Sequence, residues 1–335
     1  MRKGGSYSDS RFGLFASMLA VLGAAALLGA ACGSDSDDSA ESGQGSGDLP
    51  RVVVTTNILG DVVSNMLGDA AEVETVMPAG ADPHEFQASA QQVDSMTKAD
   101  VIVTNGAGFE EGLEDIIESV ESGGTPVCVA IDSVETIEFA SDDHDHSDEE
   151  HSDEEHEHEH EGVDPHFFTD PARMAVAAEG LTECILEAVP ALDTDEVRSS
   201  ADEYIAELED LDAEVETTLA AIPEENRVLI TNHEVFGYFA DRYGFEVAGV
   251  ILPQSTQSEA DAAALDELAE LIEAEGVPAV FADTSAPNQL AEALAAEAGE
   301  VAVVELFSES LGPDGGETYV AMVQTNAERI ADALS

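Results

Sequence analysis

Basic residues are scarce in this chain. Of its 335 residues only 10 are Lys or Arg, against 73 Asp or Glu, and the formal net charge at pH 7 is −63. A protein that binds nucleic acid or an anionic membrane surface needs a basic patch to neutralise phosphate groups, so the composition argues against both as direct ligands. An acidic surface attracts cations and keeps a protein soluble, but it does not specify a fold.

Cysteine is also rare, with three residues in the whole chain. The first, Cys32, follows a short basic region and an apolar run over residues 12–31 that ends in small residues. This order is typical of a secretory signal that ends at a lipid-attachment cysteine. We therefore predict a signal peptide at 1–31, a lipidated Cys32, a disordered linker over 32–50, and anchoring on the outer face of the cytoplasmic membrane. Ordinary signal cleavage beside an incidental cysteine is the alternative.

The other two cysteines lie in different kinds of segment. Cys128 is in a strand pattern and Cys184 is in a helix pattern. An exported compartment permits a disulfide between them. The sequence does not indicate that these two segments meet, and we predict two separate buried thiols.

The rest of the chain alternates between strand and helix patterns. β-Branched runs such as 51–57 and 227–231 indicate buried strands, and each precedes a segment with apolar residues at helical spacing. This alternation predicts an α/β fold with mainly parallel sheets flanked by helices. Hydrophobic residues make up 44% of the chain, enough for two cores, and we place one lobe at 51–194 and the other at 222–335.

Residues 195–221 form the longest helical pattern. Apolar residues from Tyr204 to Ile222 recur at steps of three or four, which places them in one stripe. A helix of this length extends about 40 Å. We predict that it joins the two lobes as a rigid linker.

A His-rich segment at 142–161 interrupts the alternation. Apart from its histidines it contains only Asp, Glu and Ser. None of these residues can form a hydrophobic core, so we expect the segment to be disordered. His-rich tracts bind metals, and we predict an auxiliary low-affinity metal loop; a merely solvated acidic loop is the alternative. Its histidines are His144, His146, His151, His156, His158 and His160.

The tripeptide Asp-Pro-His occurs twice, at 82–84 and at 164–166. Proline fixes its own φ and is favoured at the first position of a helix, so each His is expected in the opening turn of a helix. We further expect the carboxylates of Asp82 and Asp164 to cap the N–H groups at the starts of these helices and so to orient the neighbouring loops.

Several potential metal ligands fall in loops at the predicted strand ends. In open parallel sheets, ligands bind at the carboxyl ends of the strands. His84, His166 and His233 lie in such loops, together with Glu309 or, as an alternative fourth ligand, Asp283. Three imidazoles and one carboxylate are a plausible tetrahedral zinc site. Taken singly, His233 could equally be a structural histidine, and either acid could be a solvated surface group.

Four stretches of the sequence resemble the substrate-binding proteins of bacterial zinc and manganese ABC importers. The similarity extends in order over nearly the whole mature chain. The stretches are Met77-Pro-Ala-Gly-Ala-Asp-Pro-His-Glu-Phe86, Gly162-Val-Asp-Pro-His-Phe-Phe-Thr-Asp-Pro171, Thr231-Asn-His-Glu-Val-Phe-Gly-Tyr-Phe239 and Glu305-Leu-Phe-Ser-Glu-Ser-Leu311.

This resemblance implies two α/β lobes, a long connecting helix and a metal in the cleft between the lobes. It also implies that His84, His166, His233 and Glu309 are the ligands. The family usually has Asp where Glu309 stands, which leaves Asp283 open as the fourth ligand. The His-rich segment before the second Asp-Pro-His is similar to that of the zinc-specific members.

The sequence favours zinc as the transported ligand. A His at position 233, where manganese-selective relatives tend to carry Glu, suits a borderline ion, whereas Mn²⁺ prefers carboxylates. Manganese or iron is the alternative cargo. We expect a monomer that delivers its metal to the membrane permease of an ABC importer.

Two other functional classes compete with this interpretation. A zinc hydrolase needs an open coordination position and a general base. His84-Glu85 is not followed by the second His of a His-Glu-x-x-His motif, and no Gly-x-Ser-x-Gly occurs, so we do not expect an enzyme. A surface metal store or adhesin that uses only the His-rich segment is the third class.

Overall fold

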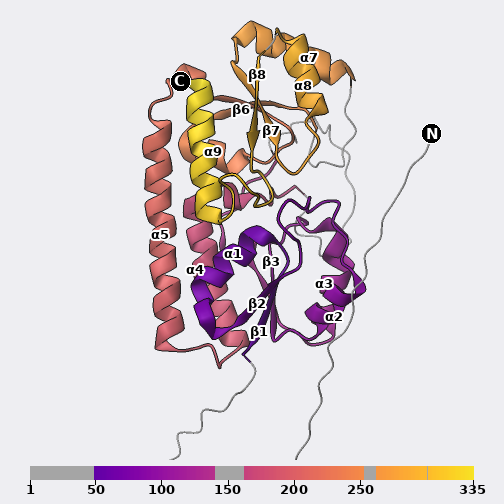
Figure 1. The fold of residues 1–335 in the computed structure, drawn as a ribbon, viewed down its shortest axis with the longest axis vertical. Coiled ribbons are helices and arrows are strands. Elements are labelled where there is room, and N and C mark those ends of the chain that lie inside the picture. The colour runs from indigo at the N-terminus through magenta and orange to yellow at the C-terminus, as the bar shows by residue number, and fades with distance from the viewer. Residues whose placement is uncertain (1–48, 140–161, 253–261, 300) are drawn as a thin grey trace, which may run out of the picture. The chain divides into compact units, whose positions relative to one another are not determined.

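The computed structural model describes residues 49–139, 162–252, 262–299 and 301–335 (Figure 1). The predicted signal peptide, Cys32, nearly all of the linker and the His-rich segment lie outside the described residues. Among the described residues, no helix is both long enough and apolar enough to cross a membrane.

Two four-stranded sheets, both entirely parallel, form the two lobes (Figure 1). The strand order is β2-β1-β3-β4 in the first sheet and β6-β5-β7-β8 in the second. The inner strands β3 and β7 are buried along their whole length, as expected where helices cover both faces of a sheet. The predicted fold class is confirmed. The strands are β1 Arg51–Val54, β2 Glu72–Thr75, β3 Val101–Thr104, β4 Val127–Val129, β5 Val228–Thr231, β6 Glu246–Val250, β7 Ala279–Asp283 and β8 Ala302–Leu306.

Side-chain caps mark the start of five of the helices among the described residues, α1, α2, α4, α5 and α9. Helix α2 begins at Ala90 because Ser89 and Gln92 form a capping box there. Helix α9 begins after Thr318, whose side chain accepts a hydrogen bond from the N–H of Ala321. The α-helices are α1 Asn57–Leu67, α2 Ala90–Thr97, α3 Glu114–Ser122, α4 Pro171–Ala188, α5 Asp195–Leu219, α6 Gly237–Tyr243, α7 Ala262–Glu275, α8 Gln289–Glu297 and α9 Tyr319–Leu334.

Helix α5 connects the two lobes. It packs against α1 and α4 of the first lobe and against α9 of the second lobe (Figure 1). Helix α9 in turn packs on β8. Its buried stripe includes Tyr204, Leu208, Leu211 and Val215, as the spacing predicts. One continuous cluster of buried apolar side chains includes residues of both sheets and of α5. The lobes are therefore joined by a shared core in addition to the chain connection.

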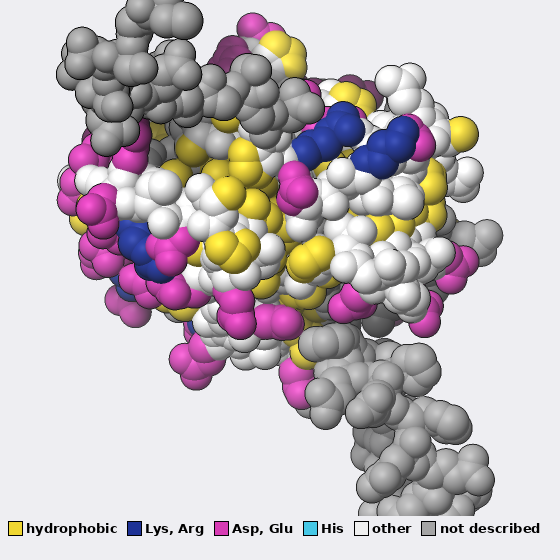
Figure 2. Space-filling view, turned by 90° about the horizontal axis from the view of Figure 1, so that it is seen from below, with side chains coloured by type: hydrophobic (Ala, Val, Ile, Leu, Met, Phe, Trp, Pro, Cys, Tyr) yellow, Lys and Arg dark blue, Asp and Glu magenta, His cyan; other side chains and the backbone are white. Residues whose placement is uncertain are grey.

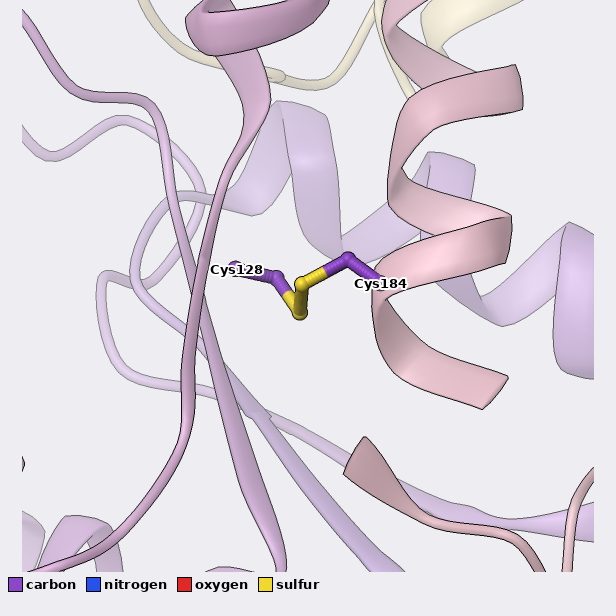
Figure 3. Close-up of a disulfide and its surroundings, with 2 residues drawn as sticks. All are labelled: Cys128 and Cys184. Carbon is purple, nitrogen blue, oxygen red and sulfur yellow. A yellow bond between two sulfur atoms is a disulfide. The ribbon is translucent and has the colours of Figure 1, made fainter. Parts of the chain in front are cut away.

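A disulfide joins Cys128 in β4 to Cys184 in α4 (Figure 3). Their Cα atoms are 5.9 Å apart, which is the usual separation for a bridge. The prediction of two separate thiols was therefore wrong. The bridge forms because α4 packs against β4, a contact between segments 56 residues apart that the local patterns do not indicate.

The two chain segments that flank the His-rich insertion pair with each other. Glu138 and Val163 form an isolated antiparallel bridge. The N–H of Phe139 donates to the carbonyl of Gly162 at 3.0 Å. The insertion therefore begins and ends at one point of the first lobe, directly before the second Asp-Pro-His.

Acidic side chains dominate the charged surface. On the face in Figure 2 they lie scattered between apolar and uncharged groups, with few basic side chains among them. Among the described residues, the large hydrophobic side chains that are exposed are Leu49 and Val176. This surface suits the attraction of cations.

Candidate metal centre

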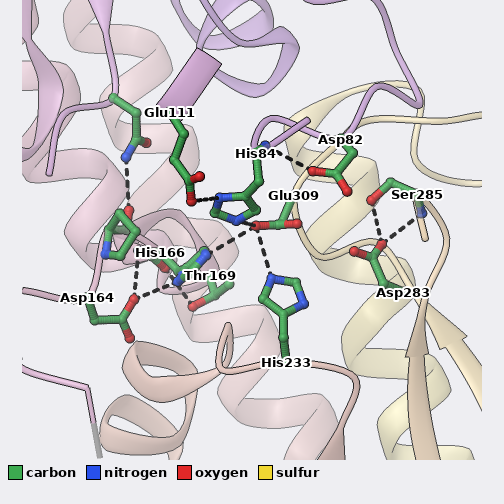
Figure 4. Close-up of polar contacts among 12 residues, drawn as sticks. Asp82, His84, Glu111, Asp164, His166, Thr169, His233, Asp283, Ser285 and Glu309 are labelled. Atoms are coloured by element: carbon green, nitrogen blue, oxygen red, sulfur yellow. Dashed lines mark hydrogen bonds and ion pairs between the residues drawn. The ribbon is translucent and has the colours of Figure 1, made fainter. Parts of the chain in front are cut away.

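Four buried side chains meet between the two sheets: His84, His166, His233 and Glu309 (Figure 4). One ligand atom of each lies within 4.8 Å of the ligand atoms of the other three. Each side chain is at most 6% exposed. The structure therefore brings together the three histidines and the carboxylate that the sequence predicts as a site.

The side chains come from loops of both lobes. His84 lies in the loop after β2, and His166 lies just before α4. His233 follows β5 and Glu309 follows β8, at the carboxyl ends of these strands. Parallel strands end at a common edge of their sheet, so the second lobe presents both of its groups from one edge.

A single oxygen lies at the centre of the cluster. Glu309 Oε1 is 2.8 Å from His84 Nε2, 3.2 Å from His166 Nε2 and 3.0 Å from His233 Nε2. The first two contacts have hydrogen-bond geometry, whereas the contact to His233 lacks that alignment. Glu309 Oε2 has no hydrogen-bond partner among the described residues. All three Nε2 atoms thus point at one carboxylate, which is the donor set of a cation site.

The two Asp-Pro-His motifs orient their histidines through the aspartate. The backbone N–H of His84 donates to Asp82 Oδ1 at 2.9 Å, and that of His166 donates to Asp164 Oδ1 at 2.9 Å. Both carboxylates accept a hydrogen bond from the local backbone, as expected, but neither caps a helix. The helices expected at the two histidines do not form there, because residues 83–85 form a turn and His166 precedes the short 3₁₀ helix Phe167–Thr169. A carboxylate that bonds the N–H two residues on closes a tight turn instead.

Carboxylates also contact the far nitrogens of two of the rings. His166 Nδ1 is 2.7 Å from Asp164 Oδ1, and His84 Nδ1 is 3.1 Å from Glu111 Oε1 (Figure 4). Such a contact holds the proton on Nδ1 and leaves Nε2 free to bind a metal. Sequence reasoning missed this position of Glu111, because the turn after β3 carries no recognisable motif that would place the side chain beside His84.

Asp283, the alternative fourth ligand, is outside the group of four. It ends β7, and its Oδ1 accepts hydrogen bonds from the N–H and hydroxyl of Ser285 at 2.7 and 2.8 Å. Burial, followed by the nearby charge of Glu309, raises the pKa of Asp283. The carboxylate that meets the three imidazoles is that of Glu309.

The charges of the cluster stabilise one another. Burial alone would raise the pKa of Glu309, but the charge of His233 and the imidazole hydrogen bonds hold it well below its ordinary range. Burial alone would lower the pKa of His166, but Asp164 and Glu309 raise it to about 9. In the same way, the hydrogen bond and charge of Glu309 outweigh burial and raise the pKa of His84. Without metal, the His166 imidazole is therefore protonated at neutral pH.

The raised pKa of His166 predicts opposite pH dependences for stability and for metal affinity. A group with a higher pKa in the folded state stabilises that state when protonated, so this stabilisation is complete below pH 6.5 and is lost as the pH rises through about 9. We expect the melting temperature of the metal-free protein to fall over this window, and metal affinity to rise because protons leave the ligands. Thermal unfolding with a chelator measures the first, and His166→Gln, the control, should show a weaker fall. If the melting temperature of the wild type rises with pH while that of His166→Gln does not, the prediction is contradicted.

Polar contacts tie the loop of Glu309 to the first lobe. Asn57 Nδ2 donates to Ser310 Oγ at 2.9 Å, and Asn57 Oδ1 accepts from the N–H of Leu311 at 2.7 Å. The N–H of Gly80, in the loop that leads to His84, donates to the carbonyl of Leu311 at 2.9 Å. The two ligand-bearing loops are thereby held side by side, although they belong to different lobes.

Two parallel-sheet lobes with a buried cluster of imidazoles and a carboxylate between them define a metal-binding protein of the two-lobed, substrate-binding class. A family model described as "Zinc-uptake complex component A periplasmic" matches residues 52–333. The chain belongs to this family, the metal-binding substrate-binding proteins of ABC importers.

Known relatives bind different metals according to their names. The zinc-binding protein TroA of Treponema pallidum is 33% identical over 322 residues, which is 94% of this chain and 97% of TroA. The solved structure of periplasmic TroA superposes with a TM-score of 0.75 at 30% identity, covering 86% of this chain and 99% of TroA. The manganese-binding lipoprotein MntA of Halalkalibacterium halodurans is 26% identical over 313 residues, which is 92% of this chain and 95% of MntA.

Proposed function

We propose that the chain captures Zn²⁺ and delivers it to an ABC importer, with His84, His166, His233 and Glu309 as the ligands. The observation that carries this proposal is the convergence of three imidazole Nε2 atoms on one buried carboxylate oxygen. The ligand atoms of a tetrahedral zinc ion lie about 3.3 Å apart, given bonds of roughly 2.0–2.1 Å. The three Nε2 atoms lie 2.8 to 3.2 Å from Glu309 Oε1, and the four ligand atoms all lie within 4.8 Å of one another, so the donors are gathered on the scale that one ion requires.

The donor set favours zinc over manganese or iron. Imidazole suits zinc, whereas carboxylates and carbonyl oxygens suit Mn²⁺. Three of the four proposed donors are imidazole nitrogens. The similarity to TroA, whose name states zinc, supports this choice, although MntA of the same family is named for manganese.

The proposal includes an anchored, exported protein. Cys32 would carry lipid, and residues 33–50 would tether the two lobes at the outer face of the cytoplasmic membrane. The lipoprotein name of MntA supports this placement. The lobes would be 51–194 and 222–335, with the helix at 195–221 between them, and a monomer would dock on the permease.

Competition between metals tests the choice of zinc. We expect one tightly bound ion per chain, and we expect zinc to displace manganese from the purified protein when both are present at equal concentration. Metal analysis after gel filtration measures the occupancy of each ion. Comparable occupancy by the two ions, or preferential retention of manganese, would reject zinc as the cargo.

A chain without residues 142–161 is the control for the His-rich segment. It should still bind one zinc ion tightly, because none of the four proposed ligands lies in that segment. Only additional, weaker binding should disappear. Loss of the tight ion in this variant would favour a metal store that uses the His-rich segment itself.

A further inference from the structure

His233 differs from the other two histidines of the centre. The Nδ1 atoms of His84 and His166 each contact a carboxylate, whereas Nδ1 of His233 has no hydrogen-bond partner among the described residues. This atom is buried, and the whole residue is 1% exposed. A buried ring nitrogen without a partner is costly to the fold, and it leaves the position of the ring proton undetermined.

Two further buried polar atoms lack partners beside this ring. They are Asp283 Oδ2 and Ser308 Oγ, and neither has a hydrogen-bond partner among the described residues. Both residues are 3% exposed. Asp283 Oδ1 is held by Ser285, which fixes the plane of the carboxylate and the direction of Oδ2.

The three residues line the same small cavity. Its volume is about 10 Å³, and its walls include His233, Asp283 and Ser308 together with the apolar rings of Phe236 and Phe281. In Figure 4, the ring of His233 lies below the carboxylate of Glu309, and Asp283 lies to its right. A cavity of this size admits one water molecule, and a buried water needs two to four polar partners. This cavity offers three.

We propose that one buried water joins His233 Nδ1, Asp283 Oδ2 and Ser308 Oγ, so that Asp283 positions the third histidine of the metal centre. The water accepts the Nδ1–H of His233 and donates to Asp283, while Ser308 provides the third contact. The proton is thereby kept on Nδ1, and the Nε2 lone pair faces the metal. Asp283 is then a positioning residue and not a ligand. This inference rests on the proposed function, because it requires His233 to bind the metal.

The same chemistry then applies to all three imidazoles. Asp164 and Glu111 contact the Nδ1 atoms of His166 and His84 directly, and Asp283 acts on His233 through the water. A carboxylate behind a ligating imidazole fixes its orientation and raises its basicity. The one water-mediated contact is at the histidine that comes from the second lobe.

Zinc titrations of Asp283→Asn and Ser308→Ala test the proposal. We expect Asp283→Asn to lower zinc affinity roughly 10- to 100-fold, as is typical when the partner of a ligating histidine is lost. Ser308→Ala should lower it less, because it removes one of three contacts of the water and no other hydrogen bond. The matched control is Asp266→Asn, which removes the same charge from an exposed position on α7. Unchanged affinity in both cavity variants would overturn the proposal.

The ring proton gives a readout that simple destabilisation does not move. In ¹⁵N-histidine-labelled protein, the Nδ1–H of His233 should exchange slowly with solvent in both the metal-free and the zinc-loaded state, and faster in Ser308→Ala. A high-resolution crystal structure should contain an ordered water with these three contacts. A dry cavity, or a direct hydrogen bond between His233 and Asp283, would overturn the proposal.

His233→Ala separates this inference from the proposed function. If that variant keeps full zinc affinity, the proposed ligand set fails, and the positioning role of Asp283 fails with it. If it loses zinc while Asp283→Asn and Ser308→Ala bind normally, the ligand set stands and only the water-mediated contact is rejected.

Discussion

Replacing His166 by Ala lowers zinc affinity roughly a hundred- to thousandfold. Structural zinc sites bind with about 10–16 kcal/mol, so one of four ligands is worth about 2.5–4 kcal/mol. His166 is fully buried, and its ring is fixed by Asp164 on one side and faces Glu309 on the other. Bulk water has no access from which to supply a replacement ligand in the same geometry. Isothermal titration with a competing chelator measures the loss.

A matched substitution controls for the removal of an imidazole as such. His151→Ala makes the same chemical change in the His-rich segment, outside the proposed site, and should leave the tight affinity unchanged. Asp164→Asn should fall between the two, because it removes only the partner of the His166 ring. Full zinc affinity in His166→Ala would refute the assigned ligand set.

Replacing Cys184 by Ser lowers the free energy of unfolding by about 4 kcal/mol. The disulfide closes a loop of 56 residues, and the entropy that such a loop removes from the unfolded chain corresponds to this value. The loss is large because the stability of most domains is only about 5–15 kcal/mol. Urea unfolding of the metal-free protein, wild type against variant, measures it.

The partner cysteine provides the control for this prediction. Cys128→Ser should cost the same, and the double variant should cost no more than either single one, because the same bond is broken. All three variants should still bind one zinc ion, since neither cysteine belongs to the cluster. Equal unfolding midpoints for the wild type and Cys184→Ser would contradict a stabilising bridge.

The fold was predictable from local patterns because each element carries its own signal. The buried strand β3 is a run of β-branched residues, and α5 carries an apolar stripe from Val197 to Leu219. Asp170 and Pro171 mark the start of α4 through a side-chain cap and a first-turn proline. Such signals identify the elements and their alternation, and from these the parallel sheets follow.

The candidate site was predictable only in part, for a physical reason. His84, His166 and His233 stand in recognisable motifs, and Glu309 follows a strand in the second lobe. Of the carboxylates that contact the Nδ1 atoms of these rings, Asp164 belongs to the second Asp-Pro-His motif, whereas Glu111 belongs to no motif. Glu111 contacts His84 although the two residues are 27 positions apart in the sequence. The choice between Glu309 and Asp283 as fourth ligand depends on which of two neighbouring strand ends faces the first lobe. Contacts of this kind arise from packing between elements, as the disulfide does, and leave no trace in local spacing.

The paired flanks of the His-rich insertion have a consequence for how this chain can vary. Glu138 and Val163 close the base of the insertion, so its length does not affect the register of the residues that follow. A longer loop adds little to the entropy of closure, about 0.6 kcal/mol for each doubling. Segments of other composition or length can therefore replace the insertion at this position while His166 stays in place.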